Sequence, residues 1–201
     1  MSRKDRSIDR RLGIETSRKE KLRVRPGDGP LARLARDYEP TPPEIFEATM
    51  TAVRQPLEQA SFVDLGAGKG RVLCLAAGRP FGRVVGVELF DRLTEVARSN
   101  LGRLDPAYVR AGELACVTAD AGAWPFPPGP KVVFLFNPFG PRVLERVLRR
   151  LGAERDEAGR GPALDLLYYE PVAAAVVDGC RWLERSAEAS HWIAWTARAA
   201  V

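Results

Sequence analysis

A glycine-rich stretch at residues 64–70 (DLGAGKG) carries the clearest chemical signal in the sequence. It follows a short β-prone run at 61–65 and precedes a helical pattern at 71–77. Glycines permit backbone conformations with positive φ and let a ligand approach the main chain closely. The start of the following helix presents unpaired N–H groups, which favour a negatively charged ligand. The stretch therefore predicts a nucleotide-binding loop.

A carboxylate stands where such a ligand would need it. Glu88 lies near the end of the next predicted strand, 83–89, and follows Gly66 by 22 residues. In open parallel sheets the ligand crevice lies at the carboxyl ends of the strands, where a carboxylate can accept hydrogen bonds from two ribose hydroxyls. A plain tight turn followed by a surface glutamate is the alternative. Strand, loop, helix and strand-terminal acid together favour the binding site.

Two common nucleotide-binding patterns fit these residues poorly. A dinucleotide fingerprint, G-x-G-x-x-G, needs a third glycine at position 71, but Arg71 stands there. A phosphate-binding P-loop needs Ser or Thr after Gly-Lys, but Gly70 follows Lys69.

Residues 62–89 (FVDLGAGKGRV…VVGVEL) instead resemble the first two motifs of class I S-adenosylmethionine (SAM)-dependent methyltransferases. Residues 118–121 (TADA) resemble the segment that contacts adenine in that family, and YEPTPP at 38–43 resembles the Thr-Pro element that precedes the first motif in amino-methylating members. The resemblance implies that SAM is the cofactor. The residues it implies for SAM binding are Thr41, Asp64, Gly66, Gly68, Gly70, Glu88, Asp120 and Ala121.

Residues 137–139 are the candidates for binding the methyl acceptor. Methyl transfer is a direct displacement, so the protein chiefly aligns donor and acceptor. Asn137, Pro138 and Phe139 follow an apolar strand and supply amide and carbonyl oxygens beside an aromatic ring, which can hold the N–H groups of an uncharged amine. They resemble the (Asp/Asn)-Pro-Pro-(Tyr/Phe) motif of the family's amino-methyltransferases, with one proline fewer. We assign these three residues to catalysis, with a strand and a Pro-Gly turn as the alternative.

Two tyrosines complete the predicted site. Small bacterial members of the family combine YxPTP, this glycine loop, NPF and a late YY-x-P element in the order seen here. Tyr38 opens the first element and Tyr169 belongs to the last, in which Glu170 stands where the family has Asn. The resemblance implies that both tyrosines bind substrate. A tyrosine that only packs at a strand end is the alternative for Tyr169.

The periodicity of the chain predicts an α/β fold. Strands are expected at 61–65, 83–89, 115–118, 131–136, 165–169, 181–186 and 192–197, and helices at 44–53 (with Thr41 as N-cap), 71–77, 91–101, 141–151 and 172–177. This alternation is typical of a Rossmann-like, doubly wound, mostly parallel sheet. Seven strands with an antiparallel C-terminal hairpin at one edge are what the resemblance implies.

Charge divides the chain into two parts. Residues 1–37 hold twelve Lys and Arg against six Asp and Glu, so the remaining 164 residues are close to neutral within a net charge of +5. Breakers at 25–30 (RPGDGP) predict a linker. We therefore expect a basic N-terminal arm at 1–37, which is partly helical or disordered, and a SAM-binding domain at 38–201. The arm gives a weak indication of nucleic-acid binding.

Composition excludes several classes of protein. Three cysteines without CxxC spacing and a single histidine argue against a disulfide framework and a metal centre. No apolar run reaches the ~20 residues that span a bilayer. We expect a cytoplasmic protein without membrane contact.

The sequence thus predicts a SAM-dependent methyltransferase that acts on an amine, with a protein lysine favoured. Nucleic acid or a small molecule remains open as the acceptor, and the oligomeric state is open as well. A NAD-dependent oxidoreductase and a non-catalytic binding module of the same fold are the alternatives from other classes.

Overall fold

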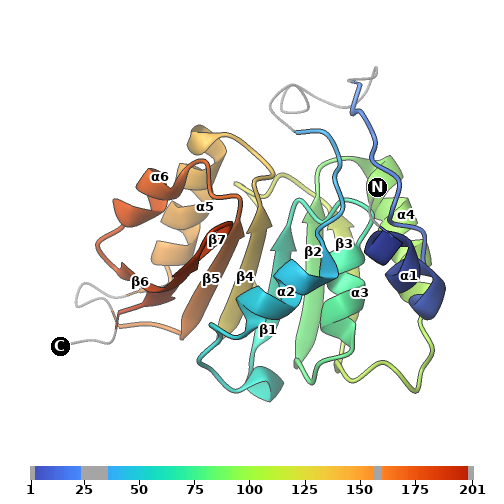
Figure 1. Ribbon diagram of the computed structural model, residues 1–201. Helices are drawn as coiled ribbons and strands as arrows, with labels where there is room; N and C mark the ends of the chain where they lie inside the picture. The colour runs from blue at the N-terminus through green and yellow to red at the C-terminus, as the bar shows by residue number, and fades with distance from the viewer. Residues whose placement is uncertain (1–2, 24–35, 156–159, 199–201) are drawn as a thin grey trace.

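The computed structural model describes residues 3–23, 36–155 and 160–198 (Figure 1). The strands are β1 (Ser61–Leu65), β2 (Arg83–Glu88), β3 (Leu114–Thr118), β4 (Lys131–Phe136), β5 (Leu164–Tyr169), β6 (Leu183–Ala189) and β7 (Trp192–Ala197). The helices are α1 (Arg3–Leu12), α2 (Pro43–Met50), α3 (Arg71–Ala77), α4 (Asp91–Gly102), α5 (Pro141–Gly152) and α6 (Ala174–Asp178), with a short 3-10 helix at Leu57–Gln59.

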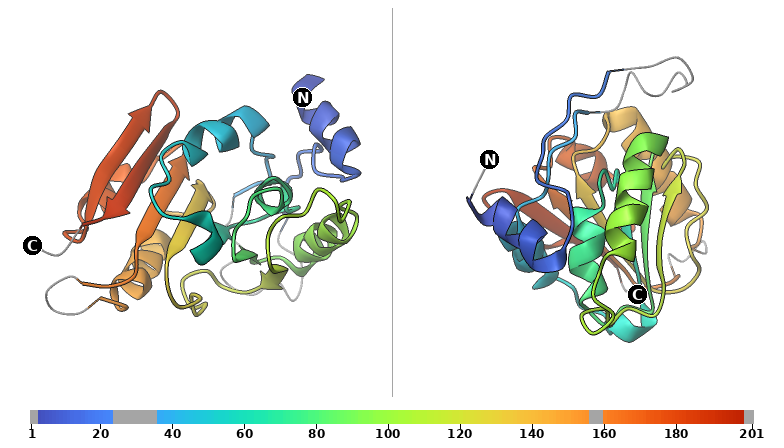
Figure 2. Two further views of the ribbon diagram at one scale, coloured as in Figure 1. Left: turned by 90° about the horizontal axis from the view of Figure 1, so that it is seen from below. Right: turned by 90° about the vertical axis from the view of Figure 1, so that its right-hand side faces the viewer.

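All seven strands form one sheet in the order β3-β2-β1-β4-β5-β7-β6. The first five are parallel, whereas β7 pairs antiparallel with both β5 and β6. The hairpin β6–β7 forms one edge of the sheet in Figure 1 and in the left view of Figure 2. The predicted doubly wound, mostly parallel sheet with a C-terminal hairpin is therefore confirmed.

Apolar side chains cover both faces of the sheet because successive residues of a strand point to opposite sides. On one face, Phe62 and Phe134 pack with Phe46 of α2, with ring centroids 6.0–6.5 Å apart. On the other face, Val63 and Val133 belong to a second core that α5 and α6 cover. Burial on both sides explains the continuously apolar central strands.

Several element boundaries differ from the sequence prediction; the helix expected at 172–177, for example, spans Ala174–Asp178. The helix expected at 44–53 ends at Met50, because Arg54 N–H donates to Asp165 Oδ2 (3.0 Å) and Pro56 cannot extend the helix. Its N-cap is Pro42 rather than Thr41, and no side chain caps it. The strand expected at 181–186 begins at Leu183, whose N–H closes a turn onto Cys180 O (3.0 Å).

The N-terminal residues that the structure describes pack on the domain. α1 lies beside α2 and α3 (right view of Figure 2), and Ile8, Leu12 and Ile14 are buried in the same core as Phe62. The linker predicted at 25–30 lies outside the described residues. In the described part of the chain, we found no helix with the length and apolar character needed to cross a membrane.

Candidate functional site

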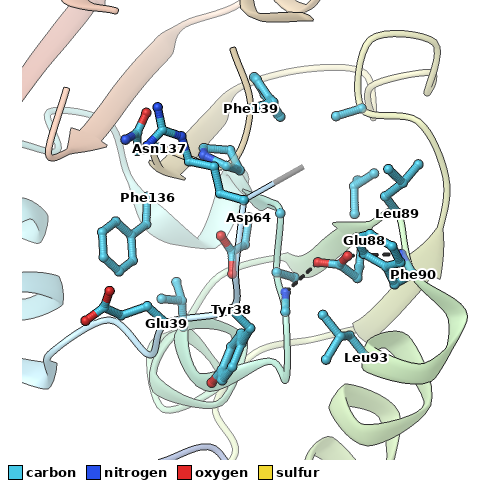
Figure 3. A pocket seen from close by; sticks show the side chains of 18 of the residues that line it. Tyr38, Glu39, Asp64, Glu88, Leu89, Phe90, Leu93, Phe136, Asn137 and Phe139 are labelled. Carbon is cyan, nitrogen blue, oxygen red and sulfur yellow. Dashed lines mark hydrogen bonds between the residues drawn. The ribbon is translucent and has the colours of Figure 1, made fainter. Parts of the chain in front are cut away.

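A cleft of about 550 Å³ opens at the carboxyl ends of the central strands. The strand order reverses between β1 and β4, because β1 pairs with β2 on one side and with β4 on the other. At such a switch point the connections that follow the two strands diverge and leave a crevice. Figure 3 shows Asp64, Glu88 and Asn137, which come from the ends of β1, β2 and β4, around this cleft.

Two glycines of the loop lie close to other parts of the chain. Gly66, Gly68 and Gly70 all have positive φ, at 80°, 54° and 79°. A Cβ on Gly66 would lie 2.3 Å from Pro138 Cβ, and one on Gly68 would lie 2.4 Å from the Tyr38 ring. Any side chain at these positions would therefore displace the residues that form the opposite side of the cleft.

Glu88 is buried at the end of β2 and is held by the backbone. Its Oε2 accepts a hydrogen bond from Gly68 N–H (2.8 Å), and its Oε1 accepts one from Phe90 N–H (3.0 Å). Burial raises the pKa of this carboxyl group, although the backbone N–H groups partly oppose the shift. The carboxylate lines the cleft and keeps lone pairs for a hydroxyl donor there.

Asp64 is the second buried acid of the cleft. It is 4% exposed, and its carboxyl group makes no hydrogen bond or ion pair with any other residue that the structure describes. Burial, with a smaller effect from the nearby Glu88, raises the pKa of Asp64 to about 8. An unpaired carboxyl group in this position favours a cationic ligand.

Two strained residues lie side by side in the cleft, directly after β4 and β5. Asn137 (φ 43°) and Glu170 (φ 47°) are the non-glycine residues with positive φ in the described chain, and both line the cleft. They directly follow Phe136 and Tyr169, which are paired in the β4–β5 register. Asn137 Oδ1 accepts a hydrogen bond from Tyr168 Oη (3.2 Å), which orients the amide. Strain of this kind is concentrated at ligand sites.

The structure brings most of the residues predicted for the site into this one cleft. The predicted residues that line it are Tyr38, Thr41, Asp64, Gly66, Gly68, Glu88, Asp120, Ala121, Asn137, Pro138 and Phe139. One carboxylate oxygen of Asp120 already has a partner within the protein, because Oδ2 accepts a hydrogen bond from Arg146 Nη2 (2.7 Å).

Gly70 and Tyr169 are not among the residues that line the cleft. Gly70 begins α3, where a Cβ would lie 2.9 Å from Ala97 Cβ, so it allows α3 and α4 to pack closely. The Tyr169 ring packs on Phe136, with centroids 4.3 Å apart, on the face of the sheet opposite to Tyr168. The role of Tyr169 in substrate binding stays a prediction.

Sequence reasoning missed Arg71 and Leu22, which also line the cleft. Arg71 counted only as a mismatch to a glycine fingerprint, yet it is 2% exposed and donates to Thr16 Oγ1 (2.7 Å). A buried arginine needs hydrogen-bond acceptors. The sequence does not show that one of them is Thr16, which lies 55 residues away in the chain.

Comparisons with known proteins identify the fold. No family model and no curated protein matches the chain. Solved structures that do match include the ribosomal protein L11 methylase from Lactobacillus delbrueckii subsp. bulgaricus (TM-score 0.52, 16% identity, 87% of this chain and 83% of that one) and the 23S rRNA methyltransferase ErmE (0.52, 17%, 80% and 69%). The mitomycin 7-O-methyltransferase MmcR also matches (0.51, 17%), over 78% of this chain and 54% of its own length.

The chain has the class I methyltransferase fold. The methyltransferases that share it act, by their names, on a protein, an RNA and a small molecule. The methyltransferase fold alone therefore does not fix the acceptor.

We predict that Gly66→Ala destabilises the fold more than Gly129→Ala does. Both glycines have φ 80°, but nothing lies within 4 Å of a Cβ at Gly129, so this control isolates the contact with Pro138. The left-handed conformation alone costs an alanine about 1–2 kcal/mol, and the clash with Pro138 adds to that cost. Urea denaturation of the two variants measures the difference. Equal losses of stability in the two variants would show that the fold does not depend on the close contact between Gly66 and Pro138.

Proposed function

We propose that this protein is a SAM-dependent methyltransferase that transfers a methyl group to an amine nitrogen, with a protein lysine as the favoured acceptor. One observation carries the proposal: the buried carboxylate of Glu88 and the glycine loop lie on one side of a single cleft, and Asn137 lies on the other. The shared fold with known methyltransferases supports it.

The residues of the cleft fit SAM. Glu88 would accept hydrogen bonds from the ribose hydroxyls, and the glycine loop that lines the cleft is fixed to Glu88 by the Gly68 N–H. Asp64 would face the cationic methionine part, and Asp120 and Ala121 would lie beside the adenine. The volume of about 550 Å³ is within the usual range for a small-molecule site, roughly 300–1,000 Å³. When bound, SAM supplies a methyl group on a positively charged sulfur.

Asn137 and the carbonyl groups around Pro138 would align the acceptor. They would accept hydrogen bonds from the amine N–H groups and direct its lone pair toward the methyl carbon. The lone pair forms the new N–C bond, the electron pair of the C–S bond stays on sulfur, and the extra proton of the product amine passes to solvent. Tyr168 would hold the amide of Asn137 in place for this step.

The charge of the cleft supports an amine rather than a phosphate-rich acceptor. Its lining contains six carboxyl groups, of which that of Asp64 is mainly protonated at pH 7 in the free protein, and two guanidinium groups, those of Arg36 and Arg71. A negative potential raises the local concentration of cations and repels nucleic acid. Glu39 lies near Phe136 in Figure 3, and Glu170, which follows the register partner of Phe136, lines the same cleft, so a basic peptide would approach there.

We predict that the protein binds SAM and that Glu88→Ala weakens binding by about tenfold or more, because hydrogen bonds to a charged group are lost. Glu113→Ala is the control, since Glu113 is exposed and pairs with Arg83 away from the cleft. Calorimetric titration with SAM, and separately with NAD, measures both variants. Saturable NAD binding without SAM binding would overturn the proposal in favour of an oxidoreductase.

We also predict that SAM binding releases a proton near pH 7. With its pKa at about 8, Asp64 is mainly protonated in the free protein at that pH, and a cationic ligand favours the charged carboxylate. SAM affinity should therefore rise from pH 6 to pH 8. Titrations at pH 7 in buffers of different ionisation enthalpy detect the proton, and Asp64→Asn should abolish the release. Identical heats for the native protein in all buffers would contradict this assignment.

We predict that label from methyl-tritiated SAM enters untreated whole-cell protein but not protein whose lysines have been acetylated. Mass spectrometry should find the label as methyl-lysine. Asn137→Ala should lower the rate by about 10²-fold, which is typical for a lost polar contact to the reacting group, while SAM affinity stays unchanged. Label in total RNA, or equal label in acetylated protein, would exclude a lysine acceptor.

A further inference from the structure

Two extended stretches, residues 14–23 and 36–41, run side by side at the cleft, and together we call them the covering segment. Glu20 and Tyr38 form an antiparallel bridge, with N–H to carbonyl distances of 3.0 and 2.9 Å in the two directions. Leu22 N–H donates to Asp37 Oδ1 (2.8 Å). Leu22 and all residues from 36 to 41 line the cleft. The described N-terminal residues thus supply part of its wall.

Arg71 connects this segment to the helix behind the glycine loop. It directly follows Gly70 and donates through Nε to Thr16 Oγ1 (2.7 Å) and through Nη2 to Ser17 Oγ (2.9 Å). Its Nη1 donates to Thr41 O (3.4 Å), so one guanidinium group binds both stretches of the segment.

Asp9 completes the network from the end of α1. It pairs with Arg71 Nη2 (3.3 Å) and accepts hydrogen bonds from Thr16 N–H (2.8 Å), Thr16 Oγ1 (2.6 Å) and Ser17 N–H (2.7 Å). Removal of Arg71 would leave Asp9 and the two hydroxyl groups without their central donor in a largely buried place.

Lys69 forms a second connection within the same loop. Its Nζ donates to Arg18 O (3.0 Å), pairs with Glu20 (3.2 Å) and lies 4.9 Å from the centre of the Tyr38 ring. Tyr38 Oη in turn donates to Thr16 O (2.7 Å). The loop that would hold SAM and the covering segment are therefore one connected unit.

The covering segment also offers a direct contact to a ligand. Leu22 and Tyr38 form a small apolar cluster with Leu89, Phe90 and Leu93, immediately beyond Glu88. This cluster lines the cleft on the side where the proposed function places the nucleoside. Such an apolar wall suits the flat face of a nucleobase, because it lies beside Glu88, whose carboxylate would bind the ribose.

We propose that residues 36–41 and Leu22 form a wall of the cofactor site that the rest of residues 14–23 supports, that Leu22 contacts the nucleoside, and that Arg71 is the positioning residue that holds this wall against the glycine loop. The inference rests on the proposed function, since it takes SAM as the ligand. Because the same contacts order the segment and close the cleft, SAM binding and the ordering of the segment stabilise each other.

The test compares Arg71→Ala with Lys131→Gln. Lys131 is a matched control because it is also 2% exposed and pairs with a carboxylate, Glu154 (2.6 Å), but does not line the cleft. Both variants should lower the melting temperature. Only Arg71→Ala should weaken SAM binding, by about tenfold or more and mainly through faster dissociation, with Arg71→Lys intermediate because it keeps the charge.

A second variant and a second measurement test the proposal even if Arg71→Ala does not fold. Leu22→Ala leaves the Arg71 network intact and should raise the dissociation rate of SAM several-fold at an unchanged melting temperature. Hydrogen exchange of peptides from residues 14–23 in the native protein should slow when SAM is added.

Two negative outcomes are distinct. If the native protein does not bind SAM, the proposed function fails and this inference fails with it. If the native protein binds SAM but Arg71→Ala and Leu22→Ala bind it equally well, or exchange in residues 14–23 does not respond to SAM, only the role of the covering segment is overturned.

Discussion

Parallel pairing of β1 with two neighbours is the constraint on which the site depends. Because β2 and β4 both run in the same direction as β1, the three strands end at one edge of the sheet. Asp64, Glu88 and Asn137 reach this edge from positions far apart in the chain. The divergence of the connections that follow β1 and β4 then leaves the space that these side chains line. An antiparallel partner in either place would move one of the three groups to the opposite edge.

Groups at the same edge of the sheet lower the stability of the fold when the cleft holds no ligand. A buried carboxyl group with a raised pKa, such as Asp64, opposes folding when it ionises, so its contribution becomes less favourable as the pH rises from about 4 toward 8. Asn137 and Glu170 add backbone strain at the same place. Sites that sacrifice stability in this way are expected where a ligand or a reaction supplies the compensation. The apolar cores on both faces of the sheet offset these costs.

The fold and eleven of the residues that line the cleft could be predicted because they depend on local patterns. Apolar runs identified the central strands, and the glycine spacing identified the loop at the end of β1. The directions of Tyr168 and Tyr169 could not be predicted, since strand residues alternate between faces and the sequence places the same residue type on both. The partners of Arg71 were also out of reach, because Asp9 and Thr16 are brought to it only by the packing of α1 on the domain.

The packing of α1 also has a consequence for the order of assembly. Ile8, Leu12 and Ile14 are buried against elements that the ribosome makes much later, including α3 at residues 71–77. During synthesis these apolar side chains cannot complete their native core until α3 has emerged and formed, although α2 lies nearer in the chain and shares that core. Contacts of such sequence separation form late and slowly. The part of the domain that contains α1 is therefore among the last to reach its native structure.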